Sequence, residues 1–147
     1  MPTKLVIGSD HAGFALKEKV KAFISSHFEL DITDVGTYSE DSADYPDYAH
    51  EAAKHVANDL NDTLGILICG SGNGISMSAN KHQEIRCALC WSEEIAELAR
   101  LHNNANMLSL PARFISEEMA FLIVKRFLTT TFEGGRHEQR VNKIACA

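Results

Sequence analysis

Short runs of apolar residues recur along the chain and predict the strands of one sheet. Each run is bounded by glycine, proline or polar residues, as buried strands are. We expect five strands, at residues 4–9, 30–35, 64–69, 85–90 and 106–110. The second of them alternates between apolar and polar residues, which is typical of an edge strand.

Between these runs, apolar residues return with the spacing of amphipathic helices. We expect helices at residues 14–28, from Pro46 to about residue 60, at 75–81, from Ser92 to about residue 102, from Ser116 to 128, and a short C-terminal helix at about 135–146. Strands that alternate with helices form parallel sheets. The sequence therefore predicts an α/β fold: a single three-layer α/β/α Rossmann-like domain, residues 1–147, with a five-stranded parallel sheet.

The central predicted strand ends in Cys69, and glycines follow at positions 70, 72 and 74. Glycines let backbone N–H groups approach an oxyanion, and a helix N-terminus favours negative charge. The turn is neither a P-loop nor a dinucleotide fingerprint, because Ile75 stands where each motif requires a glycine. Two interpretations stay open here. The turn is either an oxyanion site beside a thiol that acts as a base or nucleophile, or a tight turn with a packed cysteine.

Polar residues elsewhere extend the candidate site. Asp10 and His11 end the first strand, so we expect them at the same sheet edge as Cys69. His102 continues the apolar stripe of its helix, as a core histidine would. It is also followed by a cluster of asparagines, as a catalytic histidine beside a polar site would be.

Two arginines mark the C-terminal helix. Arg136 and Arg140 are four residues apart and share a helix face, which suits a phosphate monoester or a solvated tail.

Composition narrows the function classes. Fourteen basic and 20 acidic residues give a net charge of −6, which argues against nucleic-acid binding. We find no signal peptide and no run that would span a membrane, and four cysteines in 147 residues favour reduced thiols in the cytoplasm. The Cys87–Cys90 pair has a metal-like spacing, but residues three apart in a strand face opposite sides. We therefore expect no metal site there.

Taken together, several motifs resemble the ribose-5-phosphate isomerase B family, which includes allose- and galactose-6-phosphate isomerases. They occur in the expected order over essentially the whole chain. The motifs are Gly8–Phe14, Asp44–Pro46, Ile68–Ser76, Ala79–Lys81, Arg100–Asn103 and Glu133–His137.

The resemblance implies interconversion of ribose 5-phosphate and ribulose 5-phosphate through a cis-enediolate, without metal or cofactor. It implies that Cys69 is the base and that the Ser71 hydroxyl helps the N–H groups of the glycine turn to hold the enediolate oxygen. It also implies that His102 with Asp10 opens the furanose ring. The residues implied for substrate binding are His11, Tyr45, Gly70, Gly72, Asn73, Gly74, Ser76, Asn103, Arg113, Arg136 and Arg140.

The resemblance also implies a homodimer, or a dimer of dimers, in which His102, Asn103 and the arginines reach the other subunit's Cys69. The small-molecule partner would be a sugar phosphate, with no nucleic acid and no membrane involved. Two alternatives remain. One is a hexose-6-phosphate isomerase acting on allose or galactose 6-phosphate, and the other is a non-catalytic sugar-phosphate-binding subunit.

Overall fold

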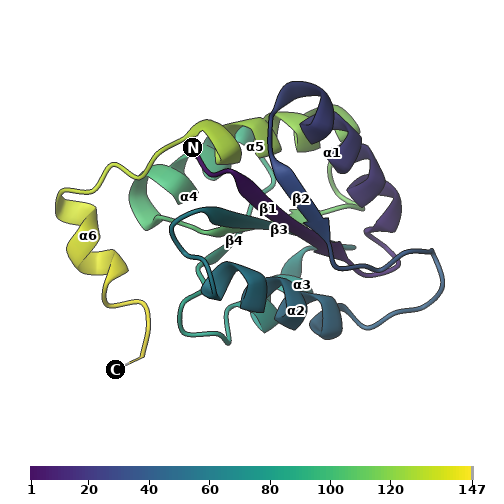
Figure 1. Ribbon diagram of the computed structural model, residues 1–147, viewed down its shortest axis with the longest axis horizontal. Coiled ribbons are helices and arrows are strands. Elements are labelled where there is room, and N and C mark those ends of the chain that lie inside the picture. Colours follow the sequence, from purple (N-terminus) through teal and green to yellow (C-terminus); the bar gives the residue numbers. More distant parts are fainter. Residues whose placement is uncertain (147) are drawn as a thin grey trace.

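The computed structural model describes residues 1–146 and contains one five-stranded sheet (Figure 1). All strand pairs are parallel, and the spatial order is β2–β1–β3–β5–β4. The strands are β1 (Lys4–Ser9), β2 (Asp31–Asp34), β3 (Thr63–Cys69), β4 (Cys87–Leu89) and β5 (Met107–Pro111). The predicted parallel sheet is confirmed. Ala147, the last residue of the predicted domain, lies outside the described residues.

Helices cover both faces of the sheet and complete three layers. One apolar cluster packs the sheet against α1 (Phe14–His27), α4 (Glu93–Asn103) and α5 (Glu117–Thr129). A second cluster packs the opposite face against α2 (Tyr45–Ala57) and α3 (Asn73–Ala79). All seven residues of β3 are buried, so this strand forms the centre of the core. Helix α6 (Arg136–Val141) stands off at the edge where the strands begin (Figure 1).

Two helix predictions need correction. The C-terminal helix ends at Val141 rather than near residue 146, because short i→i+3 turns follow it and Gln83 then binds the backbone of Cys146. Helix α3 begins at Asn73 rather than residue 75, directly after Gly72, whose φ of 76° is left-handed. This conformation favours glycine and lets the helix start immediately beyond the turn.

The two cysteines of the Cys87–Cys90 pair belong to opposite faces of the sheet. Cys87 packs in the cluster beneath α2 and α3, whereas Cys90 packs in the cluster beneath α1, α4 and α5. Burial raises the pKa of each thiol to about 12. The prediction that these thiols diverge is confirmed, and both are protonated near neutral pH.

A buried ion pair fixes the edge strand β2 to α1. Lys17 is completely buried, and its Nζ donates to both Asp34 carboxylate oxygens at 2.6 and 2.7 Å and to the Thr37 carbonyl at 2.6 Å. Lys21 donates to the same carboxylate at 2.8 Å. Burial opposes ionisation of Asp34, but the hydrogen bonds from Lys17 and Lys21 outweigh it and lower the pKa of this carboxyl group.

We expect Asp34→Asn to destabilise the fold by about 3 kcal/mol, because it leaves the buried Lys17 ammonium with only the more distant Glu18 carboxylate, at 3.8 Å, as a counter-ion. Urea unfolding at pH 7 measures the loss. Folding lowers the pKa of Asp34, so the stability that this carboxylate contributes is present above its unfolded pKa of about 3.9. That stability is lost as the pH falls below this value. The difference in the free energy of unfolding between the parent protein and Asp34→Asn should therefore shrink in acid. Asp31→Asn, at an exposed position of the same strand, is the matched control, and an equal loss there would contradict this prediction.

Candidate active site

A cleft of about 870 Å³ opens at the carboxyl edge of the sheet, between β1 and β3. From β1 the chain passes to β2 on one side, and from β3 it passes to β4 on the other. This is the switch point at which open α/β sheets bind ligands. The cleft brings together eight of the predicted site residues, from four separate segments of the chain. They are Asp10, His11, Tyr45, Cys69, Gly70, Ser71, Gly74 and Arg113.

Cys69 ends β3 and places its thiol at the base of the glycine turn. The residue is only 4% exposed, and its Sγ accepts a hydrogen bond from the Gly72 N–H at 3.2 Å. Gly74 lets the ring of Tyr45 pack against the turn, because a Cβ at this position would lie 2.5 Å from that ring. At Gly70 a Cβ would lie 3.2 Å from Nη1 of Arg113, so this guanidinium packs directly on the turn. The turn therefore presents a thiol and backbone donors beside a cationic side chain.

Asp10 and His11 enter the cleft from the end of β1, as predicted from their position after that strand. Asp10 is buried and accepts the Gly13 N–H at 3.0 Å, an interaction that fixes the loop before α1. Nδ1 of His11 lies 3.1 Å from the amide nitrogen and 3.2 Å from the carbonyl oxygen of Ala43. The backbone of Ala43 thus orients this ring, and Nε2 is the nitrogen that can serve a ligand.

Three predicted residues of the turn do not line the cleft. Gly72 shapes the turn, and the exposed Asn73 begins α3, where its N–H donates to the Ser71 hydroxyl at 3.2 Å. Ser76 is buried on the side of α3 that packs beneath the sheet. Any role of these residues in binding a substrate stays a prediction.

The other predicted residues lie at the opposite edge of the sheet. Helix α4 runs back from the end of β4 to the start of β5, so His102 and Asn103 lie where the strands begin. Arg136 and Arg140 lie on α6 at that same edge (Figure 1). The strand rise of about 3.3 Å per residue separates this edge from Cys69 by roughly 13 Å or more. One chain therefore does not bring His102 to Cys69.

His102 has neighbours that the sequence motifs did not single out as its partners. Its Nε2 lies 3.7 Å from a carboxylate oxygen of Glu133, and its ring stacks on His137 with centroids 4.2 Å apart. Partial burial and the charge of His102 lower the pKa of His137. The four-residue spacing of Glu133 and His137 could have indicated that these two side chains lie close together. The approach of α6 to α4, which brings them to His102, is not visible in the sequence.

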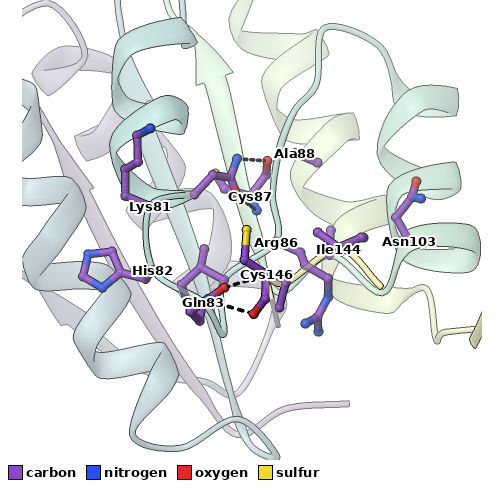
Figure 2. A pocket seen from close by; sticks show the side chains of 13 residues that line it. Lys81, His82, Gln83, Arg86, Cys87, Ala88, Asn103, Ile144 and Cys146 are labelled. Carbon is purple, nitrogen blue, oxygen red and sulfur yellow. Dashed lines mark hydrogen bonds between the residues drawn. The ribbon is translucent and has the colours of Figure 1, made fainter. Parts of the chain in front are cut away.

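A second cavity, of about 620 Å³, lies between the loop after α3 and the C-terminal segment. Figure 2 shows the amide side chain of Gln83 meeting the backbone of Cys146. Nε2 of Gln83 donates to the Cys146 carbonyl, and the Cys146 N–H donates to Oε1, both at 3.0 Å. Asn103 lies on the rim of this cavity, apart from the Cys69 cleft.

In residues 1–146, no helix combines the length and the apolar character needed to cross a membrane.

Comparisons with known proteins identify relatives over nearly the whole chain. A family model described as Ribose/Galactose Isomerase matches residues 5–144. Ribose-5-phosphate isomerase B of Escherichia coli is 43% identical over 141 residues, which cover 96% of this chain and 93% of that protein.

Solved structures of the same family have the same fold as this chain. A ribose 5-phosphate isomerase from Thermotoga maritima superposes with a TM-score of 0.93 at 51% identity, covering 97% of both chains. Ribose-5-phosphate isomerase B from Mycoplasma genitalium with bound ribulose-5-phosphate superposes with a TM-score of 0.92 at 42% identity, covering 96% of this chain and 93% of that one. The family match, the sequence relatives and the shared fold lead to one conclusion: this chain belongs to the ribose/galactose isomerase family.

Proposed function

We propose that the protein interconverts D-ribose 5-phosphate and D-ribulose 5-phosphate through a cis-enediolate, in the non-oxidative pentose phosphate pathway. The observation that carries this proposal is the Cys69 thiol at the base of a glycine turn, in a cleft with His11 and Arg113. The relatives named as ribose-5-phosphate isomerase B, one of them with bound ribulose-5-phosphate, support it. We place the enzyme in the cytoplasm, where the Cys69 thiol would stay reduced.

In this mechanism Cys69, as thiolate, removes the proton from C2 of the open-chain aldose and returns it to C1. The negative charge that develops on the carbonyl oxygen needs hydrogen-bond donors at fixed positions. The backbone N–H groups of residues 70–74 supply them, assisted by the Ser71 hydroxyl, which is exposed in the cleft. The Gly72 N–H donates to Sγ, so the same turn also fixes the position of the sulfur at the base of the cleft.

The phosphate group would bind where the cleft offers cationic and N–H donors. Arg113 packs on the turn at Gly70, and His11 is oriented by Ala43 so that Nε2 serves the ligand. A guanidinium donates two parallel hydrogen bonds to a phosphate. Tyr45, held against Gly74, would line the sugar between the phosphate and Cys69.

We propose that two copies of the chain share each active site. Ring opening requires an acid–base group, and His102 lies at the edge of the sheet opposite Cys69 in its own chain. A second copy that docks its α4–α6 edge onto the cleft would deliver His102, Asn103, Arg136 and Arg140 together. Large apolar side chains at the carboxyl edge support this contact between subunits. Trp91 is 57% and Phe114 is 75% exposed in the single chain, and a docked second copy would cover them.

Steady-state assays with ribose 5-phosphate and allose 6-phosphate test the reaction and the substrate class. We expect turnover of ribose 5-phosphate, with a clear preference over allose 6-phosphate, in the purified protein after dialysis against EDTA. A preference for allose 6-phosphate would instead identify a hexose-phosphate isomerase. Binding of both compounds without turnover of either would contradict the proposed reaction and favour a sugar-phosphate-binding subunit, with galactose 6-phosphate the next substrate to test.

A further inference from the structure

Three potential metal ligands meet outside the Cys69 cleft. His102 lies in the last turn of α4, Glu133 precedes α6, and His137 lies on α6. One ligand atom from each of them lies within 4.8 Å of the other two, and residues 1–146 contain no other group of three such ligands. The cluster thus joins two segments that the sequence separates by about thirty residues.

Backbone contacts hold the three residues in place. The Glu133 N–H donates to the carbonyl of Leu101 at 3.1 Å, which anchors Glu133 beside His102. The side chain of His137 is only 10% exposed, and its ring stacks on that of His102 at an interplanar angle of 16°. The Glu133 carboxylate lies 3.7 Å from Nε2 of His102 and 3.9 Å from Nε2 of His137. Within residues 1–146, no hydrogen bond engages the side chains of these three residues, and the carboxylate lies near both rings.

Two imidazoles and one carboxylate form a donor set that Zn²⁺ prefers. Tetrahedral zinc with bonds of about 2.0–2.2 Å places its ligand atoms about 3.3 Å apart. The two carboxylate–imidazole separations of 3.7 and 3.9 Å must therefore shorten by roughly half an ångström. The stacked rings must also tilt so that their nitrogens, which lie within 4.8 Å of one another, converge on the ion. His102 and Glu133 can make this adjustment, since their side chains are 39% and 56% exposed. Arg136 and Arg140 lie on the same helix as His137, and their charge opposes a cation and will moderate its affinity.

We propose that His102, Glu133 and His137 form an inhibitory Zn²⁺ site, with water completing the coordination. Zinc there would occupy Nε2 of His102 and so withdraw the imidazole that we propose for ring opening. The inhibition rests on the proposed function, whereas the binding of zinc does not. Substrate and zinc should therefore exclude one another at this histidine.

Calorimetric titration of the EDTA-treated protein with ZnCl₂, in a buffer that does not chelate zinc, tests the binding. We expect one zinc ion per chain in this site. Glu133→Gln and His137→Asn should each weaken the binding roughly tenfold or more, a loss that even outer-shell partners of metal sites produce. Glu133 is exposed, so Glu133→Gln keeps the test valid should His137→Asn fail to fold.

Two control variants remove histidines that, like His102 and His137, lie close to a glutamate or to another histidine. His55 lies 3.7 Å from Glu51 with the same four-residue spacing as Glu133 and His137 but without a third ligand. His82 pairs with His50, with 2.7 Å between ring nitrogens. His55→Asn and His82→Asn should bind zinc at this site as the parent protein does. Unchanged zinc affinity in both Glu133→Gln and His137→Asn, or loss of the bound zinc in either control, would overturn the proposal.

Turnover of ribose 5-phosphate gives the second measurement. Zinc should inhibit the parent enzyme, EDTA should reverse the inhibition, and Glu133→Gln should need roughly tenfold more zinc for the same inhibition. Equal inhibition of Glu133→Gln would place the inhibitory ion elsewhere, for instance on the Cys69 thiol, and would overturn this assignment. If the parent enzyme turns over no substrate, the proposed function fails, while the calorimetric comparison still decides the zinc site.

Discussion

Replacing Cys69 with alanine should lower isomerisation of ribose 5-phosphate by about three orders of magnitude, the typical contribution of a catalytic base. In the proposed mechanism the Cys69 thiol carries the proton between C1 and C2, so the variant lacks the base. Affinity for the sugar phosphate should change little, because His11 and Arg113 remain in the cleft. Steady-state kinetics measures the first effect, and titration calorimetry with the substrate measures the second.

Cys146→Ala is the matched control for the loss of a thiol. Cys146 is exposed and lies at the second cavity, away from the cleft, so its removal should leave turnover unchanged. Turnover of Cys69→Ala within a few-fold of the parent enzyme would remove the thiol from the mechanism. It would leave the glycine turn as a binding element only.

Two inactive variants should restore activity when their chains are mixed. His102→Asn should impair turnover of cyclic ribose 5-phosphate far more than that of ribulose 5-phosphate, which cannot close to a furanose. When Cys69→Ala and His102→Asn chains exchange subunits in equal amounts, half of the dimers are mixed. Each mixed dimer then contains one intact site, so about one quarter of the parent activity should return. The measurement is the specific activity after exchange, with subunit mixing verified by native mass spectrometry.

The control for this experiment mixes Cys69→Ala with the double variant Cys69→Ala/His102→Asn. No combination of these chains contains an intact thiol, so no activity should return. If the first mixture also stays inactive although its chains have exchanged, the active site does not combine residues of two chains. His102 would then have another role, such as holding α6 through its stack on His137.

Local patterns were sufficient to predict most elements of the fold. The buried run at 64–69 became β3, because glycine and polar residues bound it on both sides. The helix predicted from Ser116 is α5, and the Ser116 side chain caps it by accepting the Met119 N–H. The gathering of Asp10, His11 and Cys69 also followed from sequence, since the carboxyl ends of parallel strands meet at one edge.

Other features depend on contacts between distant residues and were not predictable in this way. Lys17 of α1 is buried, because Asp34 supplies a counter-ion from the edge strand β2. The order of the strands was likewise not visible in the sequence. The candidate site is divided between the two edges of the sheet because α4 runs back from the end of β4 to the start of β5. Only the family resemblance predicted that His102 and Cys69 act in one catalytic site.

The insertion of β5 between β3 and β4 bears on how the protein is made. During synthesis, four strands leave the ribosome before the strand that pairs with the open side of β3. Until residues 107–111 emerge, β3 exposes an unpaired edge, although every one of its residues is buried in the finished sheet. Unpaired apolar edges are templates for aggregation. The interval between the synthesis of β3 and that of β5 is therefore when this edge of the nascent chain is open to aggregation.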